Sequence, residues 1–255
     1  MDTVNTPVQK KPFPVAAVGF LLLALTFMFR ALSPLLTYVF NTYPAEHSAL
    51  FDRFDIPTLL IQLFLIAFTL SLVCMLFIGK NNIVVFVCLL GMSLCYVGTA
   101  VRDLFNYIQT FKMYGELDAI PPRFLTSLIT SLVSNAAINL CGFLGFLILA
   151  LAALFAFKGK KKLTLIWILA AVLFAVPLVI SVLATISSAV SLFSDWKHFI
   201  YWINKIIRNL AFPPFGHNLN DLAYNVATGF VSIAVNLLLV INTILLGIQL
   251  KKSVK

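Results

Sequence analysis

The sequence predicts an all-α integral membrane protein, a bundle of six transmembrane helices with both termini in the cytoplasm. The mean hydropathy is +1.02, and charged residues make up 11% of the chain, against roughly 25% in soluble domains. Six long apolar runs can each span a hydrocarbon layer about 30 Å thick. Lysines flank the first and last runs and fill every second gap between runs, and the positive-inside rule makes those segments cytoplasmic. The chain thus divides into a cytoplasmic tail, a six-helix membrane domain and a Lys-rich cytoplasmic tail: 1–12, 13–250 and 251–255.

The first expected helix, 13–40, follows Lys10 and Lys11 directly. Its basic start and apolar core are also features of a signal peptide. However, the one cleavage-like stretch ends just before Pro34, and a proline after the cut would block cleavage. The sequence therefore predicts that this helix is retained in the membrane.

The next four helices form two hairpins with tight turns, since only Lys80–Asn82 and Lys158–Lys162 separate their members. Their expected spans are 56–79, 83–110, 124–157 and 163–193. As a helix, 124–157 would be roughly 51 Å long. The lysines fix its inner end, so its outer end is expected to tilt or to project beyond the hydrocarbon layer.

An amphipathic segment, 195–210, precedes the last expected helix, 222–250. Its apolar residues recur with the i, i+3, i+4, i+7 spacing of one helical face. Trp196 and Trp202 are typical of the membrane–water boundary. We expect a helix on the outer membrane surface, either as a lid or docking element or as a connector resting in the headgroups.

The formal net charge of +9 follows from the predicted topology. The inner segments hold ten lysines and one acid, whereas eight basic and eight acidic residues balance on the outside. Lysines on the inner side suit the anionic lipids of the cytoplasmic leaflet. The charge therefore indicates the lipid bilayer of a plasma (inner) membrane as partner, and no nucleic acid.

Two clusters of small residues predict close helix approach. Gly142 and Gly145 fit packing within the chain. Ala16, Ala17 and Gly19, near the inner end of the first helix, fit either internal packing or the docking of a partner subunit.

Polar side chains from all six helices share one depth. Counted from the nearest inner lysines, one residue on each helix lies 18 to 22 residues away, or roughly 27–33 Å at the helical rise. With two neighbours on the same helical faces, these are the candidate ligand-binding residues: Arg30, Gln62, Arg102, Asn135, Asn139, Ser181, Ser232 and Asn236.

This polar layer has two interpretations. In the first, the outer half of the bundle encloses a pocket open to the outside, in which Arg30 and Arg102 attract a carboxylate or phosphate. In the second, the two arginines extend to the headgroups and the amides and hydroxyls hold helices together.

Catalytic, metal and cofactor sites are not expected. The three histidines lie in predicted outer segments, and the four cysteines lie inside apolar runs. The sequence contains no zinc-protease or nucleophile-elbow motif, and no ionisable side chain lies at the expected mid-membrane level. We therefore expect no enzyme, no catalytic residue, no metal and no cofactor.

The functional prediction is a non-enzymatic transport or ligand-capture subunit with an outward-facing polar pocket. The outline is similar to that of substrate-capture subunits of vitamin-uptake systems, although none of their motifs is present. Candidate partners are other membrane subunits or a cytoplasmic ATPase acting in trans. The alternative is a structural or assembly subunit without a ligand, whose polar stripes only hold helices together.

Overall fold

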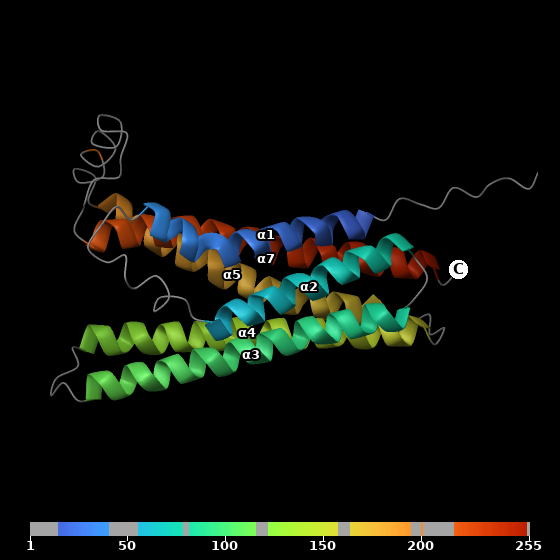
Figure 1. The fold of residues 1–255 in the computed structure, drawn as a ribbon, viewed down its shortest axis with the longest axis horizontal. Helices are drawn as coiled ribbons and strands as arrows, with labels where there is room; N and C mark the ends of the chain where they lie inside the picture. The colour runs from blue at the N-terminus through green and yellow to red at the C-terminus, as the bar shows by residue number, and fades with distance from the viewer. Residues whose placement is uncertain are drawn as a thin grey trace, which may run out of the picture.

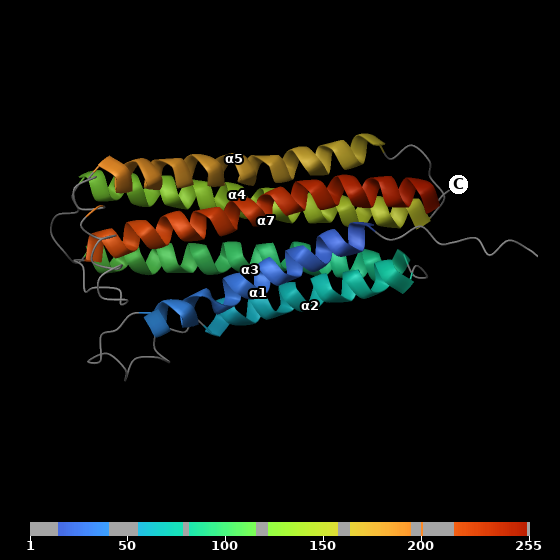
Figure 2. The same cartoon turned by 90° about the horizontal axis from the view of Figure 1, so that it is seen from above.

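Six long helices lie side by side in the computed structural model (Figures 1 and 2). The structure describes residues 15–40, 56–78, 82–115, 122–157, 164–194, 200 and 217–253. Its helices are α1 (Val15–Phe40), α2 (Ile56–Ile78), α3 (Asn82–Gly115), α4 (Pro122–Phe157), α5 (Thr164–Ser194) and α7 (His217–Ser253). These described residues contain no strand.

Each helix contains a stretch of 18 to 30 residues with a mean hydropathy of at least 2.2, which is long and apolar enough to cross a bilayer. The prediction of an all-helical chain with six such helices is confirmed. The predicted amphipathic helix 195–210 lies outside the described residues, apart from Ile200.

Two helices extend well beyond the apolar runs that predicted them. The third reaches Gly115, and the sixth begins at His217 and continues to Ser253. Hydropathy marks only the part of a helix that suits hydrocarbon, whereas the backbone hydrogen bonds continue through the flanking polar residues. The helix ends therefore had to come from the structure.

The helices form a ring that follows the chain. Each helix packs on the next one described, and α1 closes the ring by packing on α7. Seen from the side, α5, α7 and α1 form one layer over α4, α3 and α2 (Figures 1 and 2). The start of α1 and the end of α7 lie at the same end of the bundle (Figure 1), and which end faces the cytoplasm stays a prediction.

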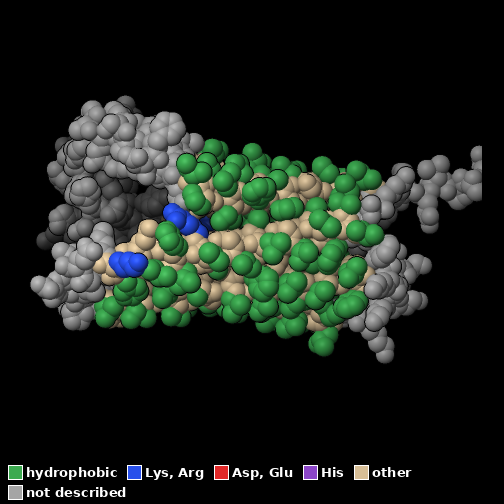
Figure 3. All heavy atoms as spheres, turned by 60° about the horizontal axis from the view of Figure 1, so that its bottom comes forward, with side chains coloured by type: hydrophobic (Ala, Val, Ile, Leu, Met, Phe, Trp, Pro, Cys, Tyr) green, Lys and Arg blue, Asp and Glu red, His purple; other side chains and the backbone are tan. Residues whose placement is uncertain are grey.

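The surface of the bundle is apolar. On the face shown in Figure 3, hydrophobic side chains cover the body of the described helices, and the visible Lys and Arg side chains lie toward one end. Leu165, Val101 and Phe230 are among many large apolar side chains that remain more than half exposed. Such an exterior suits lipid rather than water.

Aromatic side chains and glycines pack the interior between α3, α4 and α5. Phe146 and Phe174 meet edge to face with ring centroids 5.0 Å apart. A methyl group added at Gly145 would overlap the Phe174 ring, and one at Gly142 would overlap Tyr96. The two glycines thus admit rings against the backbone of α4, as their spacing predicted.

The small residues of α1 bring this helix close to its neighbours. Ala16 and Ala17 are fully buried, and Gly19 lies directly against the Asn242 side chain of α7. Of the two interpretations of this cluster, internal packing is the one that the structure supports.

We predict that Gly19→Ala destabilises the protein by about 1–3 kcal/mol, because the added methyl group would overlap the buried Asn242 amide. Combining it with Asn242→Ala should recover part of the loss. Gly98→Ala is the matched control, since its methyl group would meet only the tip of Ile61, at 3.3 Å. Thermal unfolding in detergent measures all four proteins, and equal melting of Gly19→Ala and wild type would contradict the close contact.

Candidate functional site

The predicted polar layer is divided between pairs of neighbouring helices. On the α3–α4 pair, the Asn139 amide donates a 2.8 Å hydrogen bond to the Asp103 carboxylate. One turn outward, the Asn135 amide donates to the Tyr107 hydroxyl at 3.1 Å, and this hydroxyl shares a 2.7 Å bond with Ser131. A step of four residues toward the C-terminus of α3, from Asp103 to Tyr107, therefore corresponds to a step of four residues toward the N-terminus of α4. This is the pairing expected of antiparallel helices.

The contact between α3 and α4 continues toward the N-terminal end of α3. The Ser93 hydroxyl donates to the Phe143 carbonyl at 2.9 Å. The Tyr96 ring lies on Gly142, with its centroid 5.6 Å from that of Phe146. Polar and aromatic contacts thus join α3 and α4 from Ser93 to Tyr107 on α3.

A second pair of candidate residues joins α5 to α7. The Asn236 amide donates to the Ser181 hydroxyl at 2.9 Å and reaches the Pro177 carbonyl at 3.4 Å. Ser181 and Asn236 are only 6% and 7% exposed. Ser232, half-buried, lies one turn away from Asn236 on α7. This contact links two neighbouring helices.

Hydroxyl groups of threonines are satisfied differently. Several of them donate to a backbone carbonyl three or four residues earlier on their own helix, an arrangement that needs no second helix. Examples are Thr26 to Leu23, Thr69 to Leu65, Thr185 to Ser181 and Thr243 to Leu239, at 2.7–2.8 Å. Bonds between helices come instead from asparagine amides and from hydroxyls such as those of Ser93 and Tyr107.

The remaining three candidates lie on α1, α2 and α3. Arg30 is exposed on α1. Gln62 is half-buried on α2, and its Oε1 is buried without a hydrogen-bond partner. The Arg102 guanidinium lies 5.7 Å from the centre of the Phe105 ring on the same helix, within the range of a cation–π contact.

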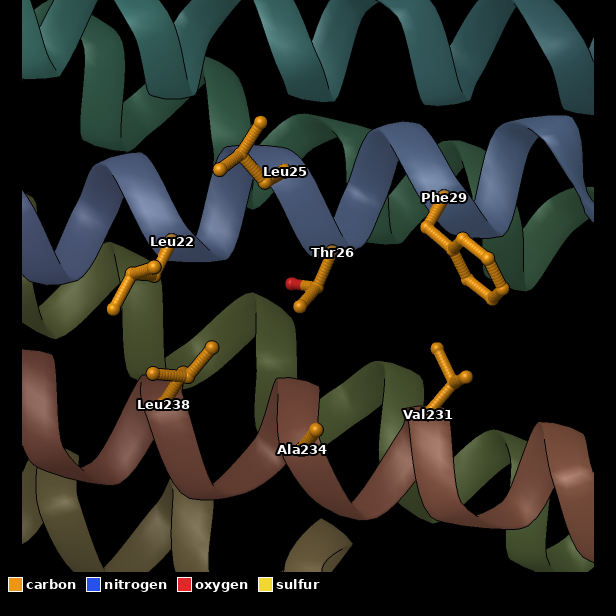
Figure 4. A pocket seen from close by; sticks show the side chains of 7 residues that line it. All are labelled: Leu22, Leu25, Thr26, Phe29, Val231, Ala234 and Leu238. Atoms are coloured by element: carbon orange, nitrogen blue, oxygen red, sulfur yellow. The ribbon is translucent and has the colours of Figure 1, made fainter.

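An apolar groove lies between α1 and α7 in the part of the bundle beyond Gly19. Its volume is about 320 Å³, and Figure 4 shows Leu22, Thr26 and Phe29 projecting toward Leu238, Ala234 and Val231. The remaining lining residue is Leu25. None of the eight candidate residues lines this groove.

A buried amide at the end of the groove nearest Gly19 was not among the candidates. Asn242 is fully buried, and neither Nδ2 nor Oδ1 has a hydrogen-bond partner. An orphaned buried polar group costs about 1–3 kcal/mol. Asn242 is one turn beyond Leu238 on α7, so it ends the groove where it meets Gly19.

Metal chemistry has no visible basis in the described part of the chain. No group of three His, Cys, Asp or Glu side chains there is placed to hold a metal ion. The absence of a cofactor and of enzymatic activity stays a prediction.

Sequence reasoning missed Asp103 and Tyr107 as partners of the predicted amides. They are four residues apart on one face of α3, opposite the similarly spaced Asn135 and Asn139 on α4. This matching spacing in two consecutive helices was a usable signal. Using it would have meant treating Asp103 as an acceptor for the next helix.

No protein-family model, curated protein or solved structure matches this chain. Its function is therefore inferred from its own residues.

Proposed function

We propose that this multi-pass membrane protein is a non-enzymatic structural or assembly subunit, in which the outer polar layer fastens helices together. The observation that carries the proposal is the use made of the buried amides. Asn139 and Asn236, both predicted to face a ligand, bond to Asp103 and Ser181 on the neighbouring helices. Other membrane subunits are the partners that such a role implies.

The free energies expected of these hydrogen bonds fit a role in supporting the packing of the helices. Hydrogen bonds between transmembrane helices contribute on average about 0.6 kcal/mol and at most about 1.7. The two amide bonds on the α3–α4 pair and the Asn236–Ser181 bond on the α5–α7 pair would together contribute only a few kcal/mol. That is enough to select one register over another, because a shifted register leaves each amide unpaired in hydrocarbon.

A second candidate function is transport or capture of a small anion in a pocket, with a cytoplasmic ATPase as partner if transport is driven. The observation that favours it is Arg30, whose side chain is exposed on α1. A guanidinium binds a carboxylate or phosphate through paired hydrogen bonds.

The proposed setting is a plasma (inner) membrane with both termini in the cytoplasm, following the lysines. A cysteine at Lys160 in an otherwise cysteine-free chain should react with a membrane-impermeant maleimide only after the membrane is opened. Labelling in intact cells would show that the predicted orientation is wrong.

The structural role predicts that Asn139→Leu lowers the free energy of unfolding by about 0.5–2 kcal/mol, because Asp103 loses its donor. Asn106→Leu is the matched control, since Asn106 is an exposed amide at the outer end of α3. Equilibrium unfolding in bicelles measures both variants.

The same assay separates the two candidate functions. Under the structural role, Asn139→Leu melts below Asn106→Leu, and a panel of small carboxylates and phosphates leaves wild type unchanged. Under ligand capture, one of these anions raises the wild-type melting temperature, Arg30→Ala removes that rise, and Asn139→Leu unfolds like its control.

A further inference from the structure

The groove between α1 and α7 is built to take a hydrocarbon chain. Six of its seven lining residues are apolar, and the seventh, Thr26, donates its hydroxyl to the Leu23 carbonyl of its own helix at 2.7 Å. Apolar cavities stay dry, and one of about 150 Å³ holds a benzene molecule. At about 320 Å³, this groove offers roughly twice that space to apolar matter.

The direction and position of the groove match those of a lipid chain. Leu22 lies opposite Leu238, and Phe29 lies opposite Val231 (Figure 4). The groove therefore follows the helix axes for seven residues, or about 10 Å. Both walls belong to membrane-spanning stretches, and Leu22, Leu25 and Phe29 are half-exposed on the side that faces the membrane.

The two ends of the groove differ in chemistry. At the inner end, the contact between Gly19 and Asn242 closes the gap between the helices. At the outer end, Arg30 follows Phe29 and lies one turn beyond Thr26 on the same face of α1. Its side chain is exposed, and a guanidinium binds phosphate through paired hydrogen bonds.

We propose that this seam binds one membrane phospholipid, with an acyl chain in the α1–α7 groove and its phosphate on Arg30. The acyl chain covers apolar surface of both helices. Arg30 binds the phosphate because their charges are complementary. The site goes beyond the proposed structural role and does not depend on it, because none of the helix ties between α3 and α4 or between α5 and α7 takes part.

Native mass spectrometry of the full chain tests this site by titrating two lipids with identical acyl chains, dioleoylphosphatidylglycerol and dioleoylglycerol. Wild type should retain one phosphatidylglycerol molecule and bind dioleoylglycerol, which lacks the phosphate, at least about tenfold more weakly. Arg30→Gln should weaken phosphatidylglycerol binding by a similar factor and leave dioleoylglycerol binding unchanged. Ala234→Phe, which fills the groove, should weaken the binding of both lipids.

Two control variants separate a built site from ordinary surface lipid. Lys112→Gln removes an exposed cation from the end of α3, and Ala184→Phe adds the same ring to an exposed position of α5. Both should bind phosphatidylglycerol like wild type. Equal binding of the two lipids would overturn the role of Arg30, and undiminished binding by Ala234→Phe would overturn the groove. A failure of either arm leaves the unfolding test of Asn139→Leu unaffected.

Discussion

A polar group placed in hydrocarbon has to find its partner inside the protein, and this constraint shapes the polar layer of the bundle. Threonine hydroxyls meet it within their own helix. An amide needs a partner across the interface: Asn139 reaches Asp103 on α3, and Asn236 reaches Ser181 on α5. On the structural role that we propose, each pairing exists in only one register, so the buried amides fix how α4 lies along α3 and how α7 lies along α5.

The contact between α1 and α7 is built from different side chains. At one end of this contact, Gly19 has no side chain, so Asn242 packs directly against α1. Farther out, larger side chains such as Leu22 and Phe29 hold the helices apart and leave an apolar groove. Close approach at one end and separation at the other give this seam room for a lipid chain, whereas the polar seams are closed by their own hydrogen bonds.

The helices were predictable from sequence because hydropathy reports directly on the solvent that each segment meets. The depth of each polar side chain in the membrane was predictable, because counting residues from the lysines requires only the rise per residue of an α-helix. Its pairing was harder, because depth does not say which helices are neighbours or which way a side chain turns. Tyr107 was therefore overlooked, and Asn242 was assigned no role because it lies outside the predicted polar layer.

The central claim is that the buried amides act on neighbouring helices, and a double-mutant cycle on Asn236 and Ser181 tests it most directly. Asn236→Leu, Ser181→Ala and the double variant would be unfolded in bicelles beside wild type. A tie between α5 and α7 predicts a coupling of about 0.5–1.7 kcal/mol. Strictly additive losses would contradict it and would show that the 2.9 Å contact does not hold the two helices together.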